Sequence, residues 1–291
     1  MASETVGSAA AAEAAVRAGN PKAALAALTA AVKAEPARFD LRVFLVQLLC
    51  VLGEWERAHT QLNVAAELDN VAGPMREMVG HALRCEKIRA AVFQGRRSPM
   101  LFGEPEAWLA CLIESNLRAG ASETDLALSL ARQAFDAAPA SAGTIDGTPF
   151  EWIADADSRL GPVLEAMVNG RYYWVPFSRL ADVRIEPPAD LRDIVWLPAH
   201  LRFLNGGEVL AMLPTRYPGS ERSEDEQIVM ARKTEWRSDG PPGGNGERWL
   251  GLGQRVLATD HGDHGLLTVR SIELALTPEG GSSELPAADH A

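Results

Sequence analysis

Apolar residues along this chain change their spacing near position 150, and the change divides the sequence into two parts. Before it they recur every three or four residues, as on helices with one buried face. After it most apolar runs are short or alternating, as in strands. The pattern predicts an α+β fold: a helical domain over residues 1–145, a smaller mixed domain with a mostly antiparallel sheet over 146–276, and a disordered tail over 277–291.

The helical part contains an internal repeat. Two similar blocks begin at Gly19 and Gly53, 34 positions apart, each with a glycine to turn the chain and an alanine five residues later. This period is that of tetratricopeptide repeats, in which each unit is a pair of packed helices. We expect two such units, then one longer helix over 75–93 and a third, degenerate helix pair over 108–139.

A stack of helix pairs has an open inner groove that can hold a peptide or a helix. The first helix of each pair usually lines this groove, which makes Glu13, Arg17, Val43 and Gln47 candidate protein-binding residues. Alternatively, the helix pairs only scaffold the second domain. Because a fold does not by itself establish a function, both interpretations stay open.

The junction between the two parts is rich in aromatic residues. Apolar positions over 152–167 recur at helical spacing, and Asn169-Gly170 can end a helix because both residues tolerate the left-handed conformation. The residues at 172–175 have high strand propensity. We expect Trp152 and Trp174 to be buried where helices meet the sheet, as core residues in preference to a ligand pocket.

The second part predicts a sheet interrupted by one helix. Asn205-Gly206-Gly207 is a strong hairpin turn, and Ser223 fits the N-cap of a helix over 223–232. A loop rich in glycine and proline follows at 238–246. The strands are expected at 183–185, 194–197, 201–204, 209–213, 250–259 and 266–276.

Charge and composition limit the possible partners. The formal net charge is −11, and the basic residues form no cluster of the kind that binds nucleic acid. The most apolar segment, 43–52, is too short to span a bilayer, and the N-terminus lacks the pattern of a secretion signal. Cys50, Cys85 and Cys111 lie in apolar helical contexts, which suits buried thiols in a reducing compartment. These features predict a globular cytoplasmic protein with neither nucleic acid nor membrane as partner.

Few residues could take part in catalysis or bind a metal. Asp155 and Asp157 have no neighbouring histidine or third acid, so a capping or salt-bridge role is favoured over a metal or acid/base site. Arg159 lies four positions after Asp155, and we expect the two to pair on one helix face. The segment 260–264, DHGDH, contains metal-ligand types, but it falls at an expected hairpin turn, where Asp and Gly are common anyway. No nucleophile elbow or phosphate-binding loop is present, so the sequence predicts no catalytic residue, no metal and no cofactor.

Several longer phrases carry a family resemblance. They are FQGRRSPMLFGEPEAW at 93–108, FEWIADADSRLGPVLE at 150–165, GRYYWVPF at 170–177, EPPADLRDIVWL at 186–197, PTRYPGS at 214–220, TEW at 234–236 and GLGQRVLATD at 251–260. With them the chain resembles the ImpE/TagJ (SciE-type) family, accessory proteins of bacterial type VI secretion. The resemblance implies a tetratricopeptide-like domain, a C-terminal sheet domain and no known catalysis.

The resemblance also implies a role and partners. The role is that of a cytoplasmic adaptor which binds the N-terminal helix of the smaller sheath subunit and assists sheath assembly or recycling, alongside the AAA+ sheath-recycling ATPase. The family phrases lie chiefly in the second domain, whereas the groove favoured on physical grounds lies in the first, so the binding surface stays open. The alternative is a small-molecule-binding or hydrolytic domain in the C-terminal half, in which Asp155, Arg159, Arg171 and Tyr172 would converge on a closed pocket.

Overall fold

Two helix hairpins and a longer helix form the N-terminal half, as the repeat predicts. The computed structural model describes residues 2–69, 71, 73–239 and 248–275. The two glycines at the repeat turns adopt left-handed φ angles of 80° at Gly19 and 69° at Gly53, and Asn20 caps the second helix by accepting a hydrogen bond from the Ala23 N–H. The helices are α1 (Ala2–Arg17), α2 (Pro21–Ala34), α3 (Phe39–Val51), α4 (Trp55–Leu68) and α5 (Gly73–Phe93).

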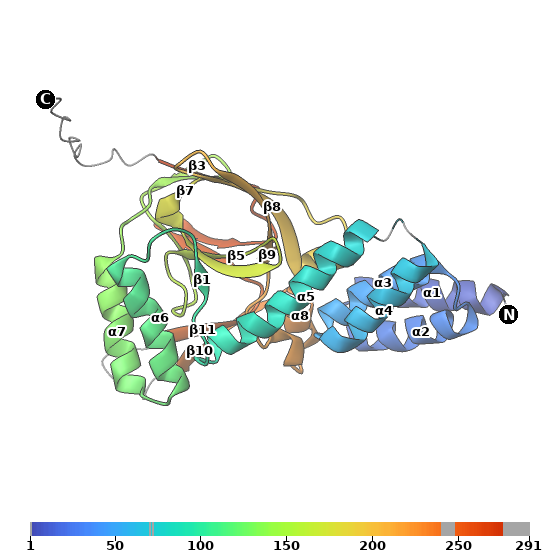
Figure 1. The fold of residues 1–291 in the computed structure, drawn as a ribbon. Helices are drawn as coiled ribbons and strands as arrows, with labels where there is room; N and C mark the ends of the chain where they lie inside the picture. The colour runs from blue at the N-terminus through green and yellow to red at the C-terminus, as the bar shows by residue number, and fades with distance from the viewer. Residues whose placement is uncertain (1, 70, 72, 240–247, 276–291) are drawn as a thin grey trace, which may run out of the picture.

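A third helix pair stands apart from the first two. It consists of α6 (Ala107–Gly120) and α7 (Thr124–Ala137), the predicted degenerate copy. Figure 1 shows that α5 runs from the stacked pairs to the sheet, while α6 and α7 lie on the far side of the sheet half. The helical half therefore flanks the sheet from two directions.

Within the described residues a nine-stranded sheet dominates the C-terminal half, in the order β1-β6-β5-β9-β8-β7-β14-β2-β3. Every neighbouring pair is antiparallel except β1 and β6, which are parallel, so the predicted mostly antiparallel sheet is confirmed. The strands are β1 (Met100–Leu101), β2 (Gly143–Ile145), β3 (Thr148–Phe150), β5 (Val163–Val168), β6 (Arg171–Pro176), β7 (Leu180–Ile185), β8 (Trp196–Phe203), β9 (Glu208–Pro214) and β14 (Ser271–Leu274).

Two smaller sheets and several short helices complete the described part of the chain. One sheet has the order β13-β12-β4, and the other pairs β10 with β11. Their strands are β4 (Ile153–Asp155), β10 (Thr234–Asp239), β11 (Arg248–Gly253), β12 (Val256–Thr259) and β13 (Gly262–Gly265). The short helices are η2 (Phe177–Arg179), η3 (Leu191–Ile194), η4 (Ser220–Arg222) and α8 (Glu226–Val229).

The helix predicted over 152–167 is wrong. Its residues form β4 and β5 instead, and all six residues of β5 are buried. A strand buried on both faces is apolar at nearly every position, so it satisfies a helical spacing as well as an extended one. Asn169-Gly170 is the turn of the β5–β6 hairpin, with φ angles of 48° and 73°, and does not end a helix.

Other boundaries in the second half also shift. The helix expected at 223–232 is only the single turn α8, capped by the Asp225 side chain instead of Ser223, and Ala231 follows it with a φ of 54°. The strand expected at 250–259 is split into β11 and β12 because Gly253 turns the chain with a φ of 94°. The runs at 194–197 and 201–204 fall largely in one strand, β8, and the first run begins in η3.

The remaining expectations for this half have mixed outcomes. The hairpin turn at 205–207 joins β8 to β9, as predicted. In the described part of the run expected at 266–276, which ends at residue 275, only β14 is a strand. Most of the loop expected at 238–246, and the tail expected at 277–291, lie outside the described residues.

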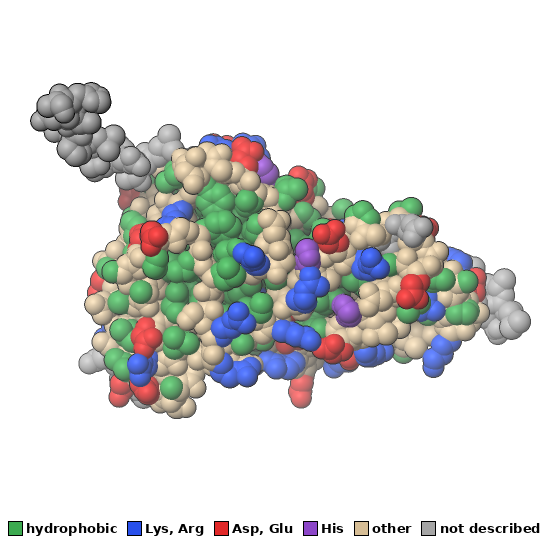
Figure 2. Space-filling view, viewed as in Figure 1, with side chains coloured by type: hydrophobic (Ala, Val, Ile, Leu, Met, Phe, Trp, Pro, Cys, Tyr) green, Lys and Arg blue, Asp and Glu red, His purple; other side chains and the backbone are tan. Residues whose placement is uncertain are grey.

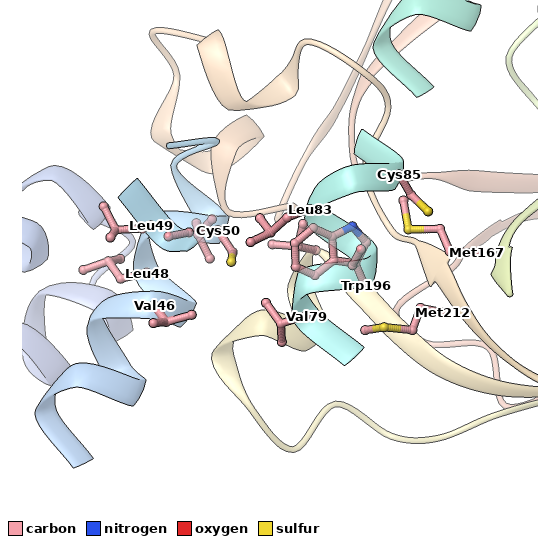
Figure 3. Close-up of a cluster of buried hydrophobic side chains, with 14 of the residues drawn as sticks. Val46, Leu48, Leu49, Cys50, Val79, Leu83, Cys85, Met167, Trp196 and Met212 are labelled. Carbon is pink, nitrogen blue, oxygen red and sulfur yellow. The ribbon is translucent and has the colours of Figure 1, made fainter. Parts of the chain in front are cut away.

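Two apolar cores meet at the inner strands of the large sheet. One fills the sheet's own interior, and the other extends from the repeats across α5 to residues of β5, β6, β8 and β9. Figure 3 shows this second core, in which Met167 and Met212 from the sheet lie beside α5 and Trp196 lies among residues of α3 and α5. This second core therefore contains residues of both halves of the chain.

The tryptophan prediction for the junction is half right. Trp174 is 1% exposed and its ring packs edge-on against Phe93 of α5, with the centroids 6.2 Å apart. Trp152 is 41% exposed, because it precedes β4 at the surface, beside Phe135 in the lining of an open pocket. Trp196 joins the two halves instead, since it is fully buried and lies 5.8 Å from the ring of Trp55.

Candidate functional site

Ionised side chains are buried where α5 crosses the large sheet. Arg89 of α5 donates two hydrogen bonds to Glu165 of β5, at 2.7 and 3.0 Å, and a third to the backbone carbonyl of Arg216 at 2.6 Å. One turn earlier on α5, Glu86 lies 3.5 Å from Arg89 and accepts a 2.8 Å hydrogen bond from the Trp196 indole. A single helix therefore places an acid and a base against two strands of the sheet.

The sheet side of this cluster adds a chain of hydrogen bonds. The Tyr172 hydroxyl donates to Glu165, and the Trp174 indole donates to the Tyr172 oxygen at 2.7 Å. Glu165 also pairs with Arg255, which precedes β12. Burial raises the pKa of the Tyr172 hydroxyl, so it stays protonated and can act as the donor.

Arg255 links this cluster to a second buried carboxylate. Its guanidinium lies 2.9 Å from one oxygen of Asp155, whose other oxygen accepts hydrogen bonds from the Tyr217 hydroxyl at 3.0 Å and from the Asp157 N–H at 2.9 Å. Burial raises the pKa of Asp155 to about 6, although Arg255 acts in the opposite direction. Burial likewise lowers the pKa of Arg255 to about 10. Both oxygens of Asp155 are thus committed to bonds within the protein.

Asp157 and Arg159 form the outer part of the cluster. Asp157 accepts hydrogen bonds from the Arg159 guanidinium at 2.8 and 2.5 Å, and from the Gly251 N–H at 2.7 Å. The Arg159 guanidinium in turn lies over the Phe93 ring, 4.7 Å from its centroid. The pair connects the loop after β4 to α5 and to β11.

These residues form what we call the junction network. It joins four carboxylates, those of Glu86, Asp155, Asp157 and Glu165, to three guanidinium groups, those of Arg89, Arg159 and Arg255. The buried Arg216 guanidinium donates to backbone carbonyls and forms no ion pair with these carboxylates, but its charge brings the formal total to balance. Burying ions is costly unless each is paired and hydrogen-bonded, and here the partners come from both halves of the chain. The network supplies orientation and charge balance, and it fixes α5 to the sheet.

The structure changes the partners assigned to the predicted site residues. The pairing of Asp155 with Arg159 on one helix face is wrong, because the segment is a strand followed by a loop and Asp155 pairs with Arg255. Tyr172 lies inside the junction network, whereas Arg171 is exposed at the β5–β6 hairpin. Three of the four predicted cluster residues therefore come together, each satisfied by a partner that the sequence did not indicate.

Two arginines from the C-terminal half cap the repeats. Arg216 donates to the carbonyl oxygens of Cys50 and Val51 at the end of α3, and Arg232 donates to those of Val16 and Arg17 at the end of α1. These carbonyls occupy equivalent places in the two repeats, 34 positions apart. Helix C-termini carry unsatisfied carbonyls and a partial negative charge, so a guanidinium there contributes both hydrogen bonds and electrostatic attraction.

The predicted groove is partly occupied by the chain itself. On α1, Glu13 and Arg17 are exposed and lie 3.6 Å apart as a salt bridge. On α3, Val43 is half-buried and Gln47 is only 8% exposed. The segment η3 packs against α3, so the α3 side of the groove is shared with the second half of the chain.

The hairpin prediction for the DHGDH segment is confirmed. Thr259 pairs with Gly262 across the turn between β12 and β13, and the Asp260 side chain accepts a 2.8 Å hydrogen bond from the Glu151 N–H. Throughout the parts of the chain that the structure describes, no group of three or more His, Cys, Asp or Glu side chains is arranged to hold a metal ion.

The sequence contained a signal for two of the residues that were missed. Glu165 and Arg255 are charged residues inside otherwise largely apolar stretches, a pattern that favours buried pairing because an unpaired charge is rarely buried, whereas Arg89 follows other charged residues and has no such signal. The pattern could flag Glu165 and Arg255 but could not assign the partners, which lie 76 and 100 positions apart in the pairs Arg89–Glu165 and Asp155–Arg255.

Comparisons with known proteins agree with this architecture. Residues 147–273 match the family described as ImpE protein, and residues 15–72 match a tetratricopeptide repeat family. The crystal structure of protein VPA1032 from Vibrio parahaemolyticus has a TM-score of 0.81 and 25% identity, over 91% of this chain and 97% of that one.

A curated relative extends the match over nearly the whole chain. It is the type VI secretion system accessory component TagJ of Pseudomonas aeruginosa, 44% identical over 266 residues, which cover 91% of this chain and 92% of the relative. Along the described helices, none has the length and apolar character needed to cross a membrane. With a match of this identity and extent, together with the tetratricopeptide-like half and the sheet half, the chain belongs to the ImpE/TagJ family.

Proposed function

We propose that this protein is a non-catalytic cytoplasmic adaptor of a type VI secretion system that binds the N-terminal helix of the smaller sheath subunit. The observation that carries the proposal is its 44% identity, over 91% of the chain, to a type VI secretion accessory component. The AAA+ sheath-recycling ATPase is a further proposed partner, because an adaptor that holds a sheath subunit would act where the sheath is assembled or dismantled.

The geometry supports binding in preference to catalysis. An adaptor needs a rigid surface, and the junction network and shared core hold the helical half firmly on the sheet half. Groove-shaped helical surfaces bind amphipathic helices by burying apolar anchors at helical spacing. We propose the face of α1 and the start of α3, with Glu13, Arg17 and Val43 exposed or half-buried and Gln47 beneath them, as the docking surface for the sheath helix.

The hydrolytic alternative finds little support in the same geometry. A pocket of about 400 Å³ reaches Asp155, but its other lining residues are mostly apolar, among them Phe135 and Trp152. Both oxygens of Asp155 already accept hydrogen bonds, and Arg171 lies away from the pocket at an exposed hairpin. A general base must be within reach of its substrate, and this carboxylate is buried and already accepts three hydrogen bonds within the protein.

The partner can be tested with purified proteins. The full chain should co-elute with the smaller sheath subunit, and deletion of that subunit's first helix should abolish co-elution. Val43→Glu should weaken the interaction at least tenfold, because it places a charge at an apolar contact. Arg132→Glu, on the exposed side of α7, is the control and should bind normally.

Two outcomes would separate the parts of this proposal. Binding that persists without the helix would refute the helix as the ligand. Binding that needs the helix but is unaffected by Val43→Glu would refute the α1–α3 surface and leave the partner standing.

A further inference from the structure

A pocket opens between α2 and α4, with α3 beneath it. Its volume is about 350 Å³, at the lower end of the range of roughly 300 to 1,000 Å³ usual for ligand sites. The floor consists of Val32, Leu45 and Leu49, whose side chains also belong to the repeat core. The walls offer polar groups from Thr29, Thr60 and Gln61. The pocket can therefore hold one or two apolar side chains beneath a polar mouth.

The mouth of this pocket is cationic. Arg42 is held by neutral acceptors only, the Gln61 side chain at 2.8 Å and the Pro36 carbonyl at 2.9 Å, so its charge has no opposite charge beside it. Lys33 forms no ion pair with any residue in the described ranges. Two positive charges of the lining are thus unneutralised.

The other charges at the mouth cancel in pairs. Glu56 lies 2.5 Å from Lys87 of α5, and Arg57 lies 3.6 Å from Glu54. Figure 2, in the same orientation as Figure 1, shows basic side chains gathered over α5, the helix that carries Lys87. The chain has a net charge of −11, so most of its surface would repel an acidic ligand, and a local positive surface is unusual in it.

We infer that this pocket, the α2–α4 pocket, binds an acidic amphipathic peptide segment of a partner protein. An apolar anchor of the segment enters above Val32, Leu45 and Leu49, and flanking carboxylates face Lys33 and Arg42. Such an occupant matches both the apolar floor and the uncompensated charge, whereas a basic or purely apolar segment matches only one of them. The site lies apart from the α1–α3 surface and does not depend on the sheath subunit as a partner.

The test uses the full-length protein and a designed ligand. The probe is a fluorescein-labelled helical peptide of about 15 residues, with leucines at positions i, i+3 and i+7 and glutamates on the flanks. Its binding is measured by fluorescence anisotropy. Two comparison peptides replace the glutamates by lysines or the leucines by serines. The acidic leucine peptide should bind at least tenfold more tightly than either.

Variants of the chain locate the binding site. Lys33→Glu should weaken binding of the acidic peptide at least fivefold, and Thr60→Trp should weaken it similarly by filling the mouth. Lys22→Glu is the matched control, since it carries the same charge change on the same helix, 11 residues and about 16 Å away, beyond the screening length. Lys33 and Thr60 are surface positions on helices, and unchanged circular dichroism would verify that the variants fold.

Three results would overturn the inference. One is the absence of binding at peptide concentrations up to about 1 mM. Another is equal affinity for the acidic and lysine peptides. The third is unchanged affinity in both Lys33→Glu and Thr60→Trp, which would move the binding to another surface.

Discussion

Glu165→Gln should destabilise the protein more than any surface substitution, although it only replaces one carboxylate oxygen by an amide group. Glu165 is 1% exposed, accepts two hydrogen bonds from Arg89, accepts another from Tyr172 and pairs with Arg255. The amide cannot balance two guanidinium groups, and its own N–H donors face donors. Removing one partner of a buried ion pair costs about 3 to 5 kcal/mol, out of a total stability of roughly 5 to 15 kcal/mol for a typical protein.

The assay is urea denaturation followed by tryptophan fluorescence. Trp174 is linked to Glu165 through Tyr172, so it is one of the seven tryptophans whose emission should respond to the loss of this region. Because the network joins both halves, circular dichroism of the helices should report the same midpoint as the fluorescence. The control is Glu273→Gln. Among the described residues, Glu273 forms one ion pair, with Arg184 at 3.8 Å, and both side chains are more than 60% exposed, so the change should alter stability by a few tenths of a kcal/mol. A loss below about 1 kcal/mol for Glu165→Gln would refute the argument that this network is held by paired charges.

Three further substitutions test other parts of the structure. Trp174→Ala should cost about 3 to 5 kcal/mol and Trp152→Ala about 1 kcal/mol or less, measured by urea denaturation, because only Trp174 is fully buried; equal losses would contradict the assigned burial. The melting temperature of the wild type should fall as pH rises from about 4 to about 6, because burial raises the pKa of Asp155 to about 6 in the folded chain, which then holds a proton that the unfolded chain has released. Asp155→Asn should remove this fall. A wild-type profile without the fall would count against the raised pKa. Gly53→Ala should lower the melting temperature more than Gly147→Ala, since both have left-handed φ angles but only a Cβ at Gly53 would lie 2.3 Å from the Glu221 side chain, whereas Gly147 faces open space; the reverse order would show that backbone strain dominates.

The repeats could be predicted from the sequence because their signal is local. Gly19 and Gly53 mark turns whose partners are a few residues away, and the spacing of 34 repeats the same helix packing. The signal for the hairpin at 205–207 is also local, since the turn residues alone specify it. Local backbone preference is enough to specify such elements.

The buried strand and the junction network could not be obtained in this way. The run 163–168 is apolar at five of its six positions, so its period carries no information about helix or strand. The Asn169-Gly170 pair was the better guide, because it is a strong hairpin signal as well as a permitted helix end. The ion pairs depend on contacts between distant segments, and a single sequence does not specify which acid meets which base.

The arginine caps at the ends of α1 and α3 set the length of the helical array. Open solenoids gain or lose units freely, because each repeat touches only its neighbours. Here the segment from Arg216 to Arg232 runs alongside two successive helix ends and meets each with one guanidinium. An inserted unit would separate the two capped ends by another repeat, and the segment would then reach only one of them. The C-terminal half thus fixes the distance between these two helix ends, and we expect duplication of a unit within 19–52 to break one of the two caps and lower the melting temperature.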